Sequence, residues 1–126
     1  MKLIGIIVVL LFCLPFRLLA DSNTEIDHLL DFVRKSDATF IRNGQEYKPT
    51  EAVDHFQKKR EHFAKEIKSA EDFVSTAATK SLLSGQSYLV RTKDGHTQEC
   101  SKWLIEELKR FRNEKKAVPI GTPRKS

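Results

Sequence analysis

Two serines beside a lysine are the residues of this sequence whose types and spacing could do covalent chemistry. Ser81 follows Lys80 directly, and Ser84 lies three residues further on. A serine becomes a nucleophile only when a base lies within hydrogen-bond reach and is itself oriented by a third group. The recognisable serine–lysine pattern has a serine three residues before the lysine, where this chain has Ala77. A hydrolase using Ser81 or Ser84 is therefore an alternative hypothesis, no catalytic residue is assigned, and a protein that is not an enzyme is favoured.

A larger set of side chains suits binding. It mixes guanidinium groups, hydroxyls and aromatic rings: Arg42, Tyr47, Arg60, Ser81, Ser84, Tyr88 and Trp103. Arginine offers a planar fork of donors to a carboxylate, and rings supply an apolar floor. These residues predict a site for an anionic or sugar-bearing ligand. Each also has an ordinary structural explanation, such as paired strand tyrosines, a turn at Ser84 or packing of a half-buried Trp103.

The histidines do not form a metal-binding pattern. His55 and His62 lie seven residues apart in a helical stretch, which separates them by about 10 Å along the axis. Zinc-binding helices place two histidines four residues apart. On a helical wheel both histidines lie opposite the apolar stripe together with Lys58 and Lys59, so this face is expected to be exposed. No metal or other cofactor is predicted.

The first twenty residues of the 126 are typical of an export signal. Lys2 is followed by an apolar run from Leu3 to Leu14, and residues 1–20 end with the small Ala20. The run is shorter than the roughly 20 residues of a spanning helix, so a permanent anchor is the less favoured alternative. We expect a periplasmic or secreted product that starts near Asp21 and has no membrane span.

Loss of that signal changes the charge and the cysteine count. Lys2 and Arg17 are two of the 22 basic residues, so 20 remain against 17 acidic ones, a net charge of +3. Cations are interleaved with acids, which favours a solvated helix surface over a nucleic-acid-binding face. Cys13 lies in the signal, so Cys100 has no internal disulfide partner. Cys100 stands one turn before Leu104 and is expected to be a small buried residue.

The rest of the chain is expected to form one α+β domain, mostly helical, over residues 21–113, followed by a flexible basic tail over 114–126. Four helices are predicted from capping residues, apolar periodicity and Pro49 at a helix start. The predicted starts are Ser22, Pro49, Ser69 and Ser101. The first helix is expected to begin with a capping box from Ser22 to Glu25, and the second is expected to run to Lys68. Hairpins that turn at Asn43-Gly44 and Asp94-Gly95 are predicted to pair into one small antiparallel sheet.

A charged residue is expected on the apolar stripe of each of the first two helices. Extending the stripe of Ile26 and Val33 by one turn brings Asp37 onto it, and Arg60 falls inside the stripe of the second helix. A stranded buried charge is costly, so Asp37 and Arg60 are predicted to form a structural ion pair. Two alternatives stay open: the first helix ends by Ser36 and leaves Asp37 in water, or Arg60 snorkels to solvent.

Short stretches spread over nearly the whole mature chain carry a family resemblance. They are Ile26–Leu30, Ser36-Asp37, Phe40–Gly44, Tyr47, Glu51-Ala52, His55, Lys58–Arg60, Ala70–Phe73, Lys80-Ser81, Ser84-Gly85, Tyr88–Val90 and Trp103-Leu104. With these residues the sequence resembles the YfeK-like family of small exported bacterial proteins of uncharacterised function. The resemblance implies the same compartment and architecture and brings no catalytic residue. The sequence departs from the family at Lys48 and Leu82, where serines are common, which weakens any proposal that needs a hydroxyl there.

Taken together, these patterns favour a binding or interaction module of the bacterial envelope. Its partner would be an unknown envelope protein or the anionic or sugar-bearing ligand described above. The alternatives are the small envelope hydrolase and a chaperone- or inhibitor-like protein that uses an exposed hydrophobic patch.

Overall fold

A computed structural model gives the fold of residues 21–81 and 83–117, and all structural statements concern these residues. The predicted signal peptide and the end of the predicted tail lie outside them. The elements are α2 (Ser22–Lys35), β1 (Thr39–Arg42), β2 (Gln45–Tyr47), α3 (Pro49–His62), α4 (Ala70–Ala77), β3 (Leu89–Arg91), β4 (Thr97–Glu99) and α5 (Cys100–Ala117). Four helices and one small antiparallel sheet confirm the predicted α+β class. Over this part of the chain, no helix is long and apolar enough to cross a membrane.

Both predicted hairpins form, and they join through their first strands in the order β2-β1-β3-β4. Asn43 and Gly44 have φ angles of 53° and 77°, the positive values that the predicted tight hairpin turn requires. Phe40 lies opposite Val90 on one side and opposite Tyr47 on the other, so the three side chains share one sheet face. Phe40 and Val90 are buried, which shows that this face looks toward the helices.

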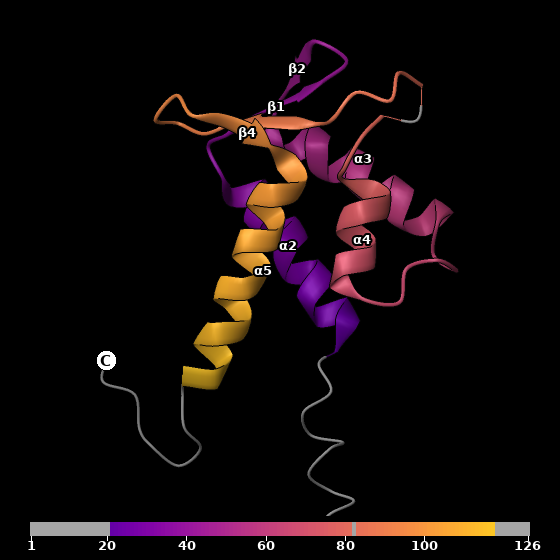
Figure 1. The fold of residues 1–126 in the computed structure, drawn as a ribbon, viewed down its shortest axis with the longest axis vertical. Coiled ribbons are helices and arrows are strands. Elements are labelled where there is room, and N and C mark those ends of the chain that lie inside the picture. The colour runs from indigo at the N-terminus through magenta and orange to yellow at the C-terminus, as the bar shows by residue number, and fades with distance from the viewer. Residues whose placement is uncertain (1–20, 82, 118–126) are drawn as a thin grey trace, which may run out of the picture.

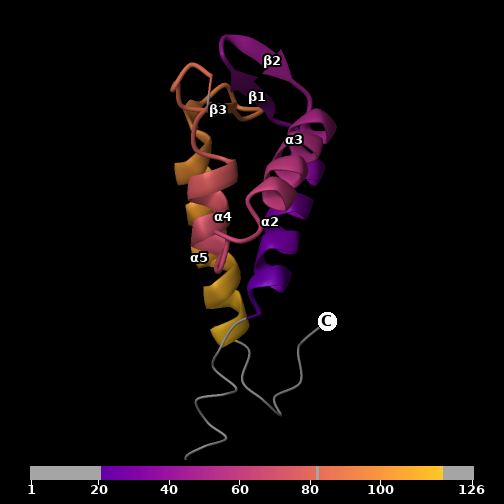
Figure 2. The same cartoon turned by 90° about the vertical axis from the view of Figure 1, so that its right-hand side faces the viewer.

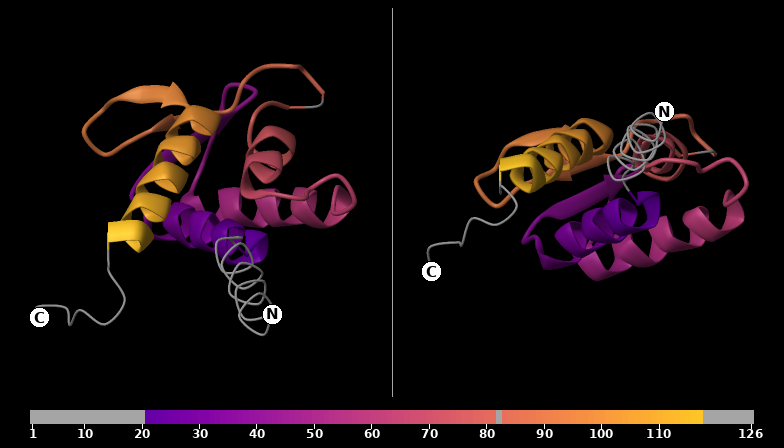
Figure 3. Two further views of the ribbon diagram at one scale, coloured as in Figure 1. Left: turned by 60° about the horizontal axis from the view of Figure 1, so that its bottom comes forward. Right: turned by 90° about the horizontal axis from the view of Figure 1, so that it is seen from below.

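The helices stand in two layers beneath the sheet. Figures 1 and 2 show the sheet across one end of the helices, and the view from below in Figure 3 shows α2 beside α3 and α4 beside α5. The core between them is apolar, with Leu29, Phe73 and Leu104 fully buried. The predicted stripe of α2 is therefore confirmed, since Ile26 and Val33 are buried.

Cys100, the first residue of α5, is also fully buried, as predicted. Burial raises the pKa of its thiol to about 12, so the reactive thiolate is not formed near neutral pH. The helix that it starts continues to Ala117, and its last turn therefore includes residues of the stretch that was expected to be a tail.

The start of α2 differs from the prediction. Asp21 is the N-cap and accepts a hydrogen bond from the Asn23 amide at 3.1 Å, so the predicted capping box from Ser22 to Glu25 is wrong. The carboxylate of Glu25 turns inward, where it accepts two hydrogen bonds from Arg112. Ser69, in contrast, caps α4 as predicted, since its hydroxyl accepts from the Asp72 amide.

Helix α3 ends at His62, short of the predicted end at Lys68. Its buried residues are Ala52, Val53, Phe56 and Lys59, whereas Ala64, which continues the helical spacing of the expected stripe past His62, is exposed. The buried face is therefore rotated from the predicted one, because the expected stripe was drawn through residues beyond the helix end.

The predicted ion pair between Asp37 and Arg60 is wrong. Helix α2 ends at Lys35, and the extended backbone at Ser36 carries Asp37 off the helical face; its carboxylate lies 3.6 Å from the Lys93 ammonium. Arg60 instead donates to the Asp27 carboxylate at 2.8 Å and to the Asn23 side chain at 3.2 Å. The guanidinium thus pairs with the solvent-facing side of α2.

Candidate binding cleft between the first hairpin and helix α3

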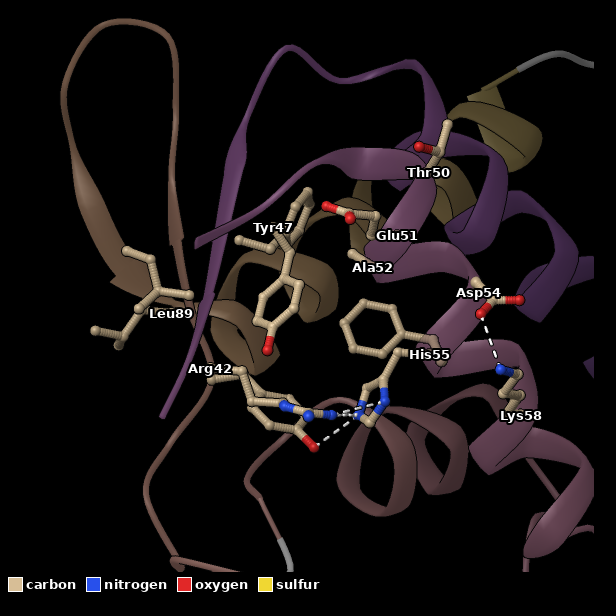
Figure 4. A pocket seen from close by; sticks show the side chains of 13 residues that line it. Arg42, Tyr47, Thr50, Glu51, Ala52, Asp54, His55, Lys58 and Leu89 are labelled. Atoms are coloured by element: carbon tan, nitrogen blue, oxygen red, sulfur yellow. Dashed lines mark hydrogen bonds and ion pairs between the residues drawn. The ribbon is translucent and has the colours of Figure 1, made fainter. Parts of the chain in front are cut away.

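A cleft of about 450 Å³ opens between the β1–β2 hairpin and α3 (Figure 4). It is lined by Phe40, Ile41, Arg42, Tyr47, Thr50, Glu51, Ala52, Asp54, His55, Phe56, Lys58, Tyr88 and Leu89. Its size is in the range of small-molecule sites, and like them it combines aromatic walls with a few polar groups.

Local structure explains why these side chains converge. Arg42 and Phe40 are two residues apart on β1 and therefore point to the same face of the sheet. Pro49 starts α3 two residues after Tyr47, so the first turn of the helix lies beside the hairpin. Ala52, Phe56 and Lys59 then recur at helical spacing and turn one face of α3 toward the strands.

The polar end of the cleft is a chain of hydrogen-bonded side chains. The Arg42 Nη1 atom lies 2.9 Å from His55 Nδ1 and 3.2 Å from Nε2, and His55 Nε2 lies 2.9 Å from the Tyr88 hydroxyl. Lys59 donates to that hydroxyl at 3.1 Å. The chain joins β1, α3 and the residue before β3.

Burial, with help from neighbouring cations, keeps His55 neutral. Burial lowers the pKa of His55 to about 4, with further contributions from Arg42 and Lys59, so the ring is neutral near pH 7. Arginine can only donate, and its shorter contact is to Nδ1, which assigns Nδ1 as the acceptor and leaves the ring hydrogen on Nε2. The Tyr88 oxygen therefore accepts from His55 and from Lys59, and its own hydrogen is free to donate.

Arg42 has unused hydrogen-bonding capacity. Its guanidinium lies 5.5 Å from the centre of the Tyr47 ring, and its buried Nε atom has no hydrogen-bond partner. Lys59, also buried, donates to Tyr88 and, at 3.4 Å, to the Lys80 carbonyl. Among residues 21–81 and 83–117, no carboxylate pairs with either cation. Arg42 at this end of the cleft and the buried Lys59 beside it are therefore two positive charges without a carboxylate partner in the described part of the chain.

The sequence prediction missed His55 and Lys59, which it placed on an exposed face. His55 is half-buried and Lys59 is 9% exposed, with its ammonium 5.2 Å from the centre of the Tyr88 ring. The spacing of Ala52, Phe56 and Lys59 at i, i+4 and i+7 could have indicated this face.

The two candidate nucleophiles hold a loop in place. The buried Ser81 hydroxyl accepts from the Asn43 side chain and from the Leu83 amide, both at 3.2 Å. Ser84 donates to the Asn43 side-chain oxygen and accepts from the Gln86 amide. In the described part of the chain neither hydroxyl bonds a histidine, a lysine or a carboxylate. The geometry does not supply the base that a serine hydrolase needs.

The remaining predicted binding residues lie away from the cleft. Arg60 faces α2, as described above, and Trp103 packs against Phe32 and Phe40 with ring centres 4.6 and 5.7 Å apart. Arg42, Tyr47 and Tyr88 are thus the predicted site residues that the structure brings together. Leu83, 93% exposed, is the one large hydrophobic side chain that stands exposed within the described ranges, so a broad apolar patch is not seen there.

A second hollow of about 410 Å³ lies between α2 and α5. Its buried Glu107 carboxylate already accepts from His28 at 2.6 Å and from Arg110 at 2.8 Å. The buried charge of this hollow is thus already paired within the protein. Nowhere in 21–81 or 83–117 do three or more potential metal-ligating side chains cluster.

The fold and the cleft define a small α+β domain with a donor-rich pocket. The chain belongs to a family of unknown function, DUF5329, whose profile matches residues 20–112. It is 32% identical over 90 residues to the uncharacterised protein YfeK of Salmonella typhimurium, an alignment that covers 69% of this chain and 75% of that protein. These matches confirm the resemblance to the YfeK-like family. No solved structure matches the chain.

Proposed function

We propose that the protein is an exported binding module whose cleft takes a small anionic ligand with an apolar body. The observation that carries the proposal is uncompensated positive charge at one end of the cleft. Among residues 21–81 and 83–117, no carboxylate pairs with Arg42, which lines the cleft, or with the buried Lys59 beside it. A ligand carboxylate or phosphate bound at the Arg42 guanidinium would supply that partner.

The unpaired groups at this end are donors. Arg42 offers its guanidinium, and the tautomer of His55 leaves the Tyr88 hydroxyl hydrogen free. A carboxylate or phosphate accepts from several donors at once and also neutralises positive charge. Phe40, Phe56 and Ala52 provide the apolar wall for the rest of the ligand. An acid is therefore favoured over a neutral sugar, whose hydroxyls bring hydrogens that would need acceptors.

Export is part of the proposal and rests on residues 1–20 of the sequence. Expression of the full chain in a Gram-negative host, followed by fractionation and N-terminal sequencing, tests it. A product that begins near residue 21 in the periplasm or medium supports export. A full-length product in the cytoplasm contradicts it.

Titration of the purified protein with 3-phenylpropionate, octanoate and phenyl phosphate, followed by two-dimensional NMR, tests the binding site. The acids should shift the amides of β1, β2 and the start of α3, and the neutral amides of the two carboxylic acids should bind about tenfold more weakly, as expected for loss of a charge-assisted contact. Arg42→Gln should abolish the preference for acid. Equal binding of acid and amide would refute the anionic site.

Arg91→Gln is the matched control. Arg91 lies on the neighbouring strand β3 and pairs with Glu46 at 2.8 Å outside the cleft. It changes the net charge by the same amount as Arg42→Gln, and it should leave acid binding unchanged.

A further inference from the structure

We infer that the ligand is a zwitterion of dipeptide size, with its carboxylate at Arg42 and its amino group at Glu51. The inference rests on the proposed function, because it takes the acid-binding end as given. It is carried by the other end of the same cleft, where the charge is reversed.

Glu51 supplies the negative charge. It lies in the first turn of α3, lines the cleft and is exposed. One carboxylate oxygen accepts from the Lys48 amide at 2.8 Å. No cation pairs with Glu51 among the residues whose structure is given. Figure 4 shows Glu51 and Arg42 at opposite ends of the opening, with the Tyr47 ring between them.

The neighbouring rim charges do not cancel that of Glu51. Asp54 lies one turn further along α3 and pairs with Lys58 at 3.2 Å, and both side chains are exposed. Two carboxylates against one ammonium leave this rim with a charge of −1. The opposite end carries the positive charge of Arg42, with the buried Lys59 behind it, so the cleft is bipolar.

The position of the Tyr47 ring between the charged ends favours a ligand longer than a free amino acid. A free amino acid carries both charged groups on one carbon and could not place them on the two sides of the Tyr47 ring. A dipeptide, at about 3.3–3.6 Å per residue, separates them by about 7 Å. Its side chains would meet the aromatic wall formed by Tyr47 and Phe56. A cleft of about 450 Å³ accommodates a molecule of that size.

Calorimetric titration with three forms of the dipeptide Ala-Phe tests the inference: the free peptide, the N-acetyl peptide and the C-terminal amide. N-acetylation should weaken binding to the unmodified protein about fivefold, as for a partly exposed ion pair. In Glu51→Gln the free and acetylated peptides should bind equally. Glutamine still accepts from the Lys48 amide, so the helix start is kept. Glu61→Gln, an exposed change on the same helix outside the cleft, should behave like the unmodified protein.

The outcomes separate the two proposals. If the free and N-acetyl peptides bind the unmodified protein equally, the amino-group site is overturned and the acid site stands. If the C-terminal amide binds as well as the free peptide, the acid site is overturned too. If none of the three forms binds at concentrations up to about 10 mM, any affinity is too weak to be useful. That result overturns the dipeptide inference. The titration with 3-phenylpropionate then decides separately on Arg42.

Discussion

The hydroxyl oxygen of Tyr88 lies 2.9 Å from His55 Nε2 and 3.1 Å from the Lys59 ammonium, and both neighbours belong to α3. This oxygen therefore ties the residue before β3 to the helix that walls the cleft. Tyr88 is 4% exposed, so the contact is shielded from water. The proposed acid-binding end is preorganised by this contact, because Arg42 is held in turn by His55.

Replacement of Tyr88 by phenylalanine should destabilise the protein by about 2 kcal/mol. The change removes the acceptor of a buried ammonium, which keeps only the Lys80 carbonyl at 3.4 Å. Urea unfolding measures the effect. Tyr47→Phe is the control, since the Tyr47 hydroxyl bonds only the exposed Gln45 side chain at 3.0 Å, and it should cost less than about 0.5 kcal/mol. Equal effects of the two changes would contradict the role of the Tyr88 oxygen.

Acid should destabilise the protein through His55. Its pKa is about 4 in the folded state and near 6.5 when unfolded, so between these values the unfolded chain binds more protons. The contribution is complete above pH 6.5 and is lost as the pH falls toward 4. Discounted for the half-exposed ring, it amounts to about 1 kcal/mol.

Urea unfolding between pH 7 and pH 4.5 checks this dependence, together with NMR titration of the ring. His55→Gln should flatten the pH dependence over that range, and His62→Gln, which changes an exposed ring, should preserve it. A ring that titrates near 6.5 would show that burial and the neighbouring Arg42 and Lys59 do not hold His55 neutral.

Loss of Arg112 should be among the most destabilising changes on the surface of the domain. Arg112 donates to the buried Glu25 carboxylate at 2.8 and 2.9 Å and to Glu71 at 2.7 and 3.1 Å, which joins α5 to α2 and α4. Arg112→Ala leaves the Glu25 charge buried without its partner, at a cost of about 3 kcal/mol. Thermal and urea unfolding measure the cost.

Arg34→Ala serves as the comparison, because Arg34 is half-exposed and lies 3.5 Å from the Asp31 carboxylate. It should cost less than about 0.5 kcal/mol. The same cluster lowers the pKa of Glu71, chiefly through its hydrogen bond with Arg112. In Arg112→Ala, NMR titration should therefore show the pKa of Glu71 rising toward its ordinary value.

Replacement of Ser81 by alanine should loosen the loop from Ser81 to Ser87 and leave ligand binding intact. The change removes an acceptor shared by the Asn43 side chain and the Leu83 amide, at a cost of about 1 kcal/mol. Hydrogen exchange should quicken at Leu83 and Gly85. Loss of a hydrolytic activity in this variant, with exchange unchanged, would instead revive the enzyme hypothesis.

The sequence predicted best those turns and helix ends whose structure depends on a few neighbouring residues. The Asn43-Gly44 turn, Pro49 at a helix start and the Ser69 cap act locally, so their structures could be read without knowing what packs against them. Burial of Cys100 followed from helical spacing to Leu104.

Contacts between residues that are far apart in the sequence could not be predicted. His55 and Lys59 look like solvated residues until the hairpin and Tyr88 cover them, and Glu25 meets an arginine 87 positions away. Arg60 pairs with Asp27 because α2 packs beside α3 in the fold. A helical wheel of one helix does not show which helix packs against it.

Within the described residues, only the side chain of Asn43 makes side-chain hydrogen bonds between the first turn and the 81–87 loop. Its amide nitrogen donates to Ser81, and its amide oxygen accepts from Ser84. A carboxylate has no such donor. Asparagine followed by glycine is also prone to lose its amide nitrogen slowly in water. Deamidation at Asn43 passes through a succinimide and gives aspartate and isoaspartate. Both products lose the donor to Ser81 and loosen the loop, and isoaspartate also lengthens the backbone of the turn, so the shelf life of the protein is tied to one side chain. Peptide mapping of stored samples alongside Asn43→Asp would show whether loop exchange rises with deamidation.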